Sequence, residues 1–387
     1  MPQYTMRSSN ASFIAIDQHA RSVTIRGLDL ATGEAKGTRL CDCPSAKDIV
    51  SWAETWASKP IRFAYESGPC GFQLAREITS LGYDCDIIAV TSIARNSEDR
   101  YLKDDKRDAE RLLAEMTALR SKCKAVWIPS EESEADRDLV RAYCDSVNAA
   151  KRAKLQLSGF LLRHGHVWNE KAKTGKLKKT WTREYINWVK SRDFPEESDK
   201  IVLDRYLRFA LEDIFRMREM EVLCLEMASS IRYKPYVNAL TRLKGVSDLN
   251  AITFITTMGD FTRFKNGRSV SSYFGLTPRR NDSGERTGKN GHITKAGDTT
   301  VRRAVIEGLA SLSTFTKGVK GVAKGKEVPS ATIEAEAKKC NLRNVKRFRH
   351  LIERGKSVNV AKVAVASELV RDMWIIGRMV QQELMAR

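Results

Sequence analysis

The sequence predicts an α/β domain with a mixed β-sheet, followed by a long helical arm and a mostly α-helical region. Near the N-terminus, short runs rich in β-branched residues alternate with segments of helical spacing, which is the pattern of α/β domains. From about residue 134 the pattern becomes long and helical. The 387 residues suffice for two or three domains, and a hydrophobic content of 42% is typical of a globular protein.

The first 132 residues carry the signals of a sheet covered by helices. A short β-meander is expected at 12–40, where SFIAID and RSVTIRGLD are separated by polar residues. Two further strands are expected at 61–66 and 85–90, and the first of them ends abruptly at SGPCG. Helices are expected at 45–58, with Ser45 as the cap, at 72–83 and at 104–120.

Two long helices are predicted at about 134–164 and 200–232. A polar, basic insertion at 165–200 separates them, so they form an antiparallel arm or an oligomerising coiled coil. Trp168 and Trp181 lie among the lysines of this insertion, which suits either nucleic acid contact or a solvated hairpin tip. The expected domains are 1–132, 133–232 and 233–387.

The last of these domains is predicted to be mostly helical. Two short helices are expected around a turn at Gly245, which is either an ordinary helix turn or a place where backbone amides hold a phosphate. The final segment, 357–387, has the amphipathic pattern of a helix that packs into a core.

Positive charge is concentrated in the second part of the chain. The whole chain has 67 Lys and Arg against 48 Asp and Glu, a formal net charge of +19. Residues 1–150 hold 20 basic and 23 acidic residues, so the excess lies in residues 151–387, with 47 basic and 25 acidic residues. A surplus of this size favours a nucleic acid partner, because each neutralised phosphate releases counterions. The alternative is a basic surface that serves only solubility.

Composition also excludes several classes of protein. An apolar run of the roughly 18 residues that a membrane span requires is missing from the sequence. The first residues lack the basic and then apolar pattern of a signal peptide. The eight cysteines, of which only Cys41 and Cys43 are closely spaced, fit reduced thiols better than a disulfide framework or a zinc site. We therefore expect a soluble intracellular protein.

Four carboxylates are candidates for a metal site. Asp17 ends the first predicted strand, Glu66 ends a later one, and Asp105 and Asp108 lie one helical turn apart near the start of a helix. Strand ends can converge at one edge of a sheet, and converging carboxylates repel one another unless cations neutralise them. Mg²⁺ prefers such oxygen ligands, and Mn²⁺ suits the same site. Taken singly, each acid is more typical of a cap or a solvated surface charge.

The motifs around these acids occur in a recognisable order. IDQH is followed by AYESGPCG and LKDDKRDAERL, and the second half of the chain contains GDFTRF, YFGLTP, NDSG and ITKAGD. In this order the chain resembles the insertion-sequence one-hundred-ten family of transposases, which includes bridge-RNA-guided recombinases. Mainly the segments 165–200 and 318–350 stay outside the resemblance.

The resemblance implies a RuvC-like DEDD domain with an RNase H-like sheet, followed by a C-terminal serine transposase domain. It implies that Asp17, Glu66, Asp105 and Asp108 are catalytic and hold Mg²⁺. Asp104 stands where the family pattern usually has Thr, and we expect it to be a bystander or an outer-shell group. His19 also matches the pattern, although such a position is equally typical of a turn histidine.

The resemblance also implies a nucleophile, Ser283 in the segment PRRNDSGERTG. Read alone, NDSG is more typical of an ordinary turn. A serine hydroxyl is a weak nucleophile until a base or a metal takes its proton, and nearby cations can stabilise the charge of a scissile phosphate. The expected nucleic acid contacts are Arg279, Arg280, Arg286, Lys289, Lys295 and Arg302.

The resemblance therefore implies a transposase that cuts and rejoins donor and target DNA through a phosphoserine link. The resemblance implies a structured guide RNA and a homo-oligomer, a dimer or tetramer, in which the two catalytic domains meet across protomers. The expected location is the cytoplasm of a bacterium or archaeon, at the nucleoid and away from membranes. Two alternatives remain: a RuvC-like nuclease or junction resolvase in which water replaces Ser283, and a nucleic-acid-binding assembly protein with vestigial acids.

Overall fold

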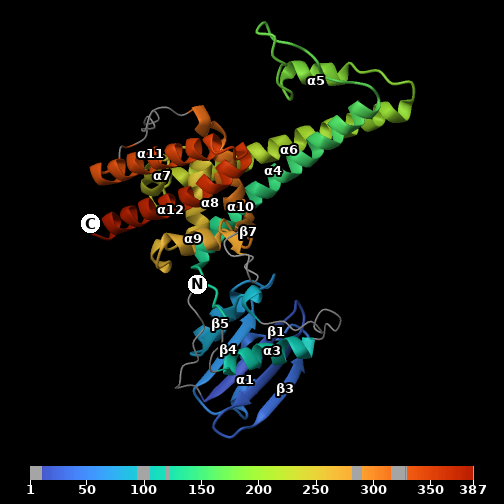
Figure 1. Cartoon of the computed structure of the whole chain (residues 1–387). Coiled ribbons are helices and arrows are strands. Elements are labelled where there is room, and N and C mark those ends of the chain that lie inside the picture. The colour runs from blue at the N-terminus through green and yellow to red at the C-terminus, as the bar shows by residue number, and fades with distance from the viewer. Residues whose placement is uncertain are drawn as a thin grey trace, which may run out of the picture. The chain divides into compact units, whose positions relative to one another are not determined.

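A computed structural model of the chain describes residues 11–93, 105–118, 123–280, 290–314, 327 and 329–386 (Figure 1). The chain divides into two compact units, residues 1–129 and residues 130–387. The first unit contains a five-stranded sheet with helices, and the second is mostly helical in its described part. The predicted combination of a mixed sheet with many helices is therefore confirmed.

The sheet of the first unit has the strand order β3-β2-β1-β4-β5. Its strands are β1 (Ser12–Gln18), β2 (Val23–Asp29), β3 (Ala35–Leu40), β4 (Ile61–Glu66) and β5 (Asp84–Ile88). The first three strands pair antiparallel as the predicted meander, whereas β4 runs parallel to β1 and β5 runs parallel to β4. The carboxyl ends of β1, β4 and β5 therefore meet at one edge of the sheet.

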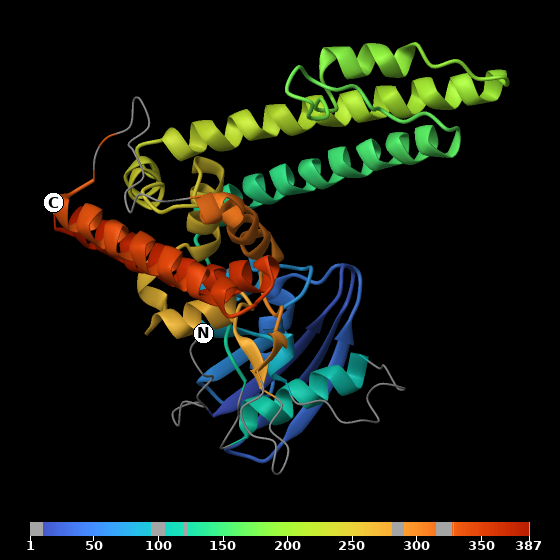
Figure 2. The ribbon, with the colours of Figure 1, turned by 45° about the horizontal axis from the view of Figure 1, so that its top comes forward.

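Helices cover both faces of this sheet. The helices α1 (Ala46–Glu54) and α2 (Gln73–Ser80) pack on the face that carries Ile14 and Ile16, and α3 (Asp105–Thr117) packs on the face that carries Phe13 and Ala15 (Figure 2). Successive side chains of a strand point to opposite faces, so a strand buried on both faces is apolar throughout. This explains the continuous apolar run of β1.

The predicted cap of α1 is confirmed. Ser45 Oγ accepts a hydrogen bond from the amide of Asp48 at 3.3 Å, and the Asp48 carboxylate accepts one from the amide of Ser45 at 2.8 Å. This reciprocal capping box satisfies two backbone donors at the start of the helix.

Two long helices form an arm in the second unit. They are α4 (Glu131–Arg163) and α6 (Glu197–Ser229), each within three residues of its predicted bounds (Figure 1). Val140 of α4 shares an apolar cluster with Ala228 of α6, whereas Leu157 of α4 packs with Leu203 of α6. The start of one helix therefore lies beside the end of the other, and the helices are antiparallel.

The insertion between the arm helices is folded. It contains α5 (Arg183–Lys190) and packs a separate apolar cluster at the far end of the arm (Figure 2). The ring centres of Trp168 and Trp181 lie 5.4 and 5.5 Å from that of Tyr185, and the indole of Trp168 donates a hydrogen bond to Lys178 O at 3.2 Å. Both tryptophans are half-buried, so they stabilise the tip of the arm rather than standing out from it.

The remaining helices form a body around one large apolar cluster. The elements of this body are α7 (Lys234–Leu240), α8 (Asp248–Met258), η3 (Phe261–Arg263), α9 (Gly267–Tyr273), β6 (Pro278–Arg280), β7 (Asn290–Ile293), α10 (Thr299–Gly308), η4 (Leu309–Thr314), α11 (Ala331–Glu353) and α12 (Val358–Met385). The predicted C-terminal helix is confirmed as α12, which contributes much of the core. The sequence patterns left α11 unassigned.

The turn between α7 and α8 is a packing feature. Gly245 has a φ of +92°, and a Cβ there would lie 3.1 Å from Gly308 O, so only glycine fits comfortably. The preceding amide, of Lys244, already donates to Asn341 Oδ1 at 2.7 Å. These contacts favour the ordinary helix turn over the phosphate-binding interpretation.

None of the described helices combines the length and the apolar character that a membrane span requires.

Candidate functional site

Asp17 and Glu66 lie at adjacent positions on paired strands. In the parallel pair of β1 and β4, Ile16 stands opposite Tyr65, and Asp17 and Glu66 are the next residues of the two strands. Side chains alternate along a strand, so Asp17 points to the same face as Ala15 and Glu66 to the same face as Ala64, which is the face covered by α3. Both carboxylates are half-buried. The register of the sheet therefore brings two carboxylates side by side at its edge.

The loop after β4 is held close to this edge. The thiol of Cys70 donates to Gln18 O at the end of β1, and the Tyr65 hydroxyl donates to Gly71 O at 2.9 Å. Gly71 has a φ of +69°, a conformation that favours glycine. These contacts explain the SGPCG segment, because they fold the chain back over the end of the strand that carries Glu66.

His19 contacts the first acid. Its backbone amide donates to Ser22 O at 2.9 Å in the turn between β1 and β2, and its Nε2 lies 3.2 Å from Asp17 Oδ2. The interpretation as a turn histidine is correct, but it missed the contact with Asp17. A histidine at this distance can orient the carboxylate.

The third group of acids lies on α3. Ala109, Leu112 and Met116 are each 1% exposed and turn this helix toward the sheet. Asp108 lies one turn before Leu112, is half-buried, and accepts a hydrogen bond from Arg111 at 2.6 Å. Asp105 begins the helix, but its side chain, like the whole of Asp104, lies outside the described part of the chain.

The structure therefore brings together part of the expected metal site. Asp17 and Glu66 are neighbours at the edge of the sheet, and α3, which carries Asp108, packs on the same face. Among the side chains that the structure describes, no three His, Cys, Asp or Glu residues form a group that could hold one metal ion. The two strand-end carboxylates nevertheless supply the oxygen donors that a hard cation prefers.

In the second unit, two of the expected cations, Arg279 and Lys295, lie at a two-stranded hairpin of β6 and β7. Arg279 is exposed and donates to Thr294 O at 3.3 Å, and Lys295 is exposed directly after the hairpin. The backbone of Arg280 belongs to β6. Ser283, Arg286 and Lys289 lie in the connection 281–289, outside the described residues.

Two glycines fix the base of this hairpin against the end of α9. A Cβ on Gly275 would lie 2.1 Å from Ala296 O, and one on Gly297 would lie 1.9 Å from Tyr273 O. Both residues have positive φ angles, +66° and +85°. The glycines of YFGLTP and ITKAGD are therefore required by close backbone contact, which places the two ends of the hairpin together.

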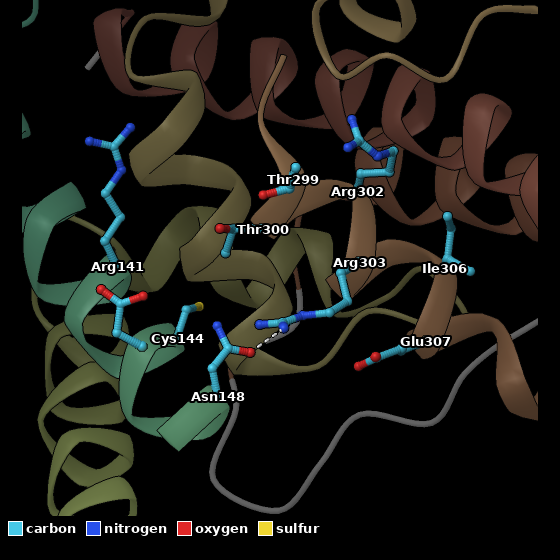
Figure 3. Close-up of a pocket in the computed structure, with 10 residues that line it drawn as sticks. Arg141, Cys144, Asn148, Thr299, Thr300, Arg302, Arg303, Ile306 and Glu307 are labelled. Carbon is cyan, nitrogen blue, oxygen red and sulfur yellow. Dashed lines mark hydrogen bonds between the residues drawn. The ribbon is translucent and has the colours of Figure 1, made fainter. Parts of the chain in front are cut away.

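Arg302 has a packing role. It lies on α10, and its guanidinium donates to Phe274 O, at the end of α9, at 3.0 Å. Its side chain also borders a cavity of about 590 Å³ between α4 and α10, together with Arg141 and Arg303 (Figure 3). Arg303 donates to Asn148 Oδ1 at 2.7 Å. This cavity was not predicted, since it depends on how two distant helices pack.

Charge in this cavity is mixed. Three arginines and two acids, Asp145 and Glu307, line it, so its net charge is small. The first turn of α10, at Thr299 and Thr300, also opens into it (Figure 3). A helix N-terminus favours anions, but the two acids oppose an anion there. We therefore place the candidate chemistry at the sheet edge and the hairpin instead.

Comparison with known proteins identifies the class. The profile described as Transposase IS116/IS110/IS902 family matches residues 237–321. "Putative transposase y4qE" of Sinorhizobium fredii is 33% identical over 322 residues, which cover 83% of this chain and 76% of the relative. "Transposase for insertion sequence element IS1533" of Leptospira borgpetersenii is 28% identical over 75% of this chain and 82% of the relative.

These similarities define a transposase, an enzyme that cleaves and transfers DNA strands. The chain belongs to the IS116/IS110/IS902 family. The family expected from the sequence motifs is thereby confirmed.

Proposed function

We propose that the protein transposes a mobile insertion sequence by cutting and rejoining DNA through Ser283, with the help of Mg²⁺. The observation that carries the proposal is the register of β1 and β4, which sets Asp17 beside Glu66 at one edge of the sheet. The sheet order β3-β2-β1-β4-β5 supports an RNase H-like, RuvC-like domain for this first unit.

Asp17, Glu66, Asp105 and Asp108 would hold Mg²⁺, and Mn²⁺ suits the same oxygen donors. The bound ion would supply positive charge at the scissile phosphodiester. The contact of His19 with Asp17, at 3.2 Å, would orient one ligand, as hydrogen-bonding partners of metal ligands commonly do.

In the proposed reaction the Ser283 hydroxyl attacks phosphorus and its proton passes to a carboxylate. The P–O bond to one DNA strand breaks, and the departing oxygen takes up a proton to become a hydroxyl. The product is a phosphodiester between Ser283 and the DNA. A hydroxyl of a second DNA strand then attacks this phosphorus and releases the serine, so one P–O bond forms for each that breaks. Rejoining therefore needs no external energy source. Arg279, Arg280, Arg286, Lys289 and Lys295 would offset the negative charge of the reacting phosphate.

We propose donor and target DNA as substrates and a structured RNA as guide, on the basis of the family resemblance and the basic second half of the chain. On the same basis we propose that the protein acts in the cytoplasm of a bacterium or archaeon, at the nucleoid.

We also propose that the arm joins protomers into a dimer or tetramer, as a coiled coil. The face of α6 that points away from α4 carries Ile201, Phe209, Phe215 and Val222, each between 47% and 62% exposed. Apolar side chains at roughly seven-residue spacing on an exposed helix face support pairing with another helix.

The decisive experiment uses labelled donor and target DNA, Mg²⁺, the full-length protein and the RNA that copurifies with it. Wild type and Ser283→Ala are compared by denaturing electrophoresis. We expect a protein–DNA adduct that survives denaturation in the wild type and is lost in Ser283→Ala. Free nicked DNA in both lanes would instead indicate a RuvC-like nuclease that uses water, and binding without strand breakage would indicate a protein with vestigial acids.

A further inference from the structure

The helix α11 carries a continuous basic surface. Between Glu336 and Glu353 it has six Lys and Arg residues and no Asp or Glu. The helix follows the segment 237–321 that matches the family profile, and the proposed reaction uses none of its side chains. A role for this surface is therefore not contained in the proposed function.

The basic residues all lie on one side of the helix. The opposite side, with Ile333, Ala337, Cys340 and Phe348, is buried in the apolar cluster of the body. Within the described structure, α11 packs mainly on α12 and η4 (Figure 1). The burial pattern leaves the solvent side of α11 open along most of its length.

Ion pairs hold part of this surface, and one of them, between Lys339 and Glu336 at 3.2 Å, lies within α11 itself. Arg343 pairs with Asp372 and Arg347 pairs with Glu368 at 3.3 Å, which ties both arginines to α12. Lys338 and Lys346 are exposed and form no ion pair with any described residue. The centre of the surface therefore keeps charge that can meet an external partner.

The exposed side of α6 shows that such a surface is not a general property of the long helices. There, Arg208 pairs with Glu212 at 2.9 Å and Arg216 pairs with Asp213 at 3.4 Å. Alternating charges of this kind produce little net field, whereas a run of one sign attracts a polyanion.

We propose that the solvent side of α11 binds the phosphodiester backbone of duplex DNA. Lys338, Lys346 and Arg349 lie within one sector of the helix, and the first and last of them are separated by roughly 16 Å along the helix axis at 1.5 Å per residue. Duplex DNA carries about one phosphate charge per 1.7 Å of its axis, or roughly nine over that length. The choice of DNA over RNA rests on the proposed transposition of DNA. The contact positions DNA without reading its sequence.

The test measures the affinity of the full-length protein for a fluorescent 20-base-pair duplex that lacks element sequences, by anisotropy and without Mg²⁺. The variant is Lys338→Gln/Lys346→Gln/Arg349→Gln. We expect binding weaker by one to two orders of magnitude at about 0.1 M salt, and a salt dependence shallower by about 2.7 in log–log slope, which is 0.9 per lost contact. Weakening should be the same for duplexes of different sequence.

The matched control is Arg205→Gln/Arg208→Gln/Arg216→Gln on α6, which removes the same charge from an exposed surface of mixed sign. It should weaken binding by less than about threefold, because distant surface charges are screened by salt. Lys338→Arg/Lys346→Arg/Arg349→Lys keeps the charge and should bind as the wild type does, which separates lost charge from lost folding.

Equal affinity of the α11 and α6 variants would overturn the proposal. So would an α11 variant that keeps DNA binding and loses only a structured RNA of the same length, since the occupant would then be RNA. Ser283→Ala, measured in the same assay, should bind DNA as the wild type does. The assay thus distinguishes an error in the proposed serine chemistry from an error in the proposed DNA-binding role of α11.

Discussion

The two units hold their candidate functional residues in different ways. In the first unit, Asp17 and Glu66 are neighbours because two strands pair in a fixed register. In the second unit, Arg279 and Lys295 are exposed around a hairpin whose ends are fixed by Gly275 and Gly297. Chemistry that needs a fixed geometry gains from a rigid sheet, whereas attraction of a polyanion needs only charge at its surface. Substitutions in the first unit should therefore reduce strand cleavage, whereas substitutions of the cations in the second unit should reduce DNA binding.

The largest effect is expected for Asp17→Asn. It removes a charge from the proposed metal site, so strand cleavage should fall by roughly a hundredfold or more, on the scale of losing one group that stabilises transition-state charge. DNA binding measured without Mg²⁺ should stay unchanged. Gel assays of cleavage and anisotropy assays of binding check the two halves of this prediction.

The control for this variant is Glu34→Gln, which alters an exposed carboxylate in the turn between β2 and β3. It should cleave DNA at the wild-type rate. If Asp17→Asn also cleaved at that rate, the sheet edge would not be the catalytic site.

A pair of glycine substitutions tests what fixes the body of the second unit. A Cβ on Gly377 of α12 would lie 1.9 Å from the ring of Phe261, so Gly377→Ala should lower the free energy of unfolding by about 1–3 kcal/mol through overpacking. Gly159 of α4 has open space around the same position, and Gly159→Ala should raise it by about 0.5–1 kcal/mol through helix propensity. Chemical denaturation monitored by circular dichroism checks both signs. Equal effects at the two sites would contradict the close approach of α12 and η3.

Around the hairpin, graded effects on binding are expected. Arg279→Gln/Lys295→Gln should weaken binding of duplex DNA by about tenfold at 0.1 M salt and reduce the log–log salt slope by about 1.8. The free energy of unfolding should hardly change, because both side chains are exposed. Arg302→Gln should leave DNA binding nearly unchanged. It should lower the free energy of unfolding by about 1 kcal/mol, because it loses the hydrogen bond to Phe274 O. Stability loss for the hairpin pair would show that these cations pack instead of binding DNA.

The smallest effect concerns acid stability of the first unit. Hydrogen bonds from Ser58, first of all, and from the amides of Ala31 and Thr32 lower the pKa of Asp29 from 3.8 to about 2. A lowered pKa means that the carboxylate stabilises the fold above about pH 4 and loses this contribution as the pH falls from about 4 toward 2. The stability difference between wild type and Asp29→Asn should therefore shrink over that interval in denaturation curves. A constant difference would contradict the role of these hydrogen bonds.

Much of the first unit could be predicted from the sequence, because its signals are local. β-branched runs gave the strands, and the cap at Ser45 marked the start of a helix. The positions of Asp17 and Glu66 at strand ends followed from the same runs, but their exact alignment needed the register of β1 and β4. The contact between His19 and Asp17 also depended on the conformation of a turn, which the sequence did not specify.

The prediction of helices was less complete in the second unit, where some buried positions hold polar or small residues in place of large apolar ones. The buried side of α11 includes Ala337, Cys340, Asn341 and Asn344, which weaken its hydrophobic pattern. Asn341 is buried because it donates to Arg242 O at 3.0 Å, and Asn344 because it donates to the Asp372 carboxylate at 2.8 Å. Such partners lie far away in sequence, so periodicity alone did not reveal this helix. The aromatic cluster around α5 was missed for a similar reason.

The central claim is that Ser283 becomes covalently linked to the DNA, and identification of the linked peptide tests this claim most directly. After nuclease trimming of the adduct and tryptic digestion, cleavage at Arg280 and Arg286 yields the peptide 281–286, in which Ser283 is the only hydroxyl side chain. We predict that mass spectrometry finds the nucleotide remnant on this peptide. A remnant on any other peptide would contradict the account.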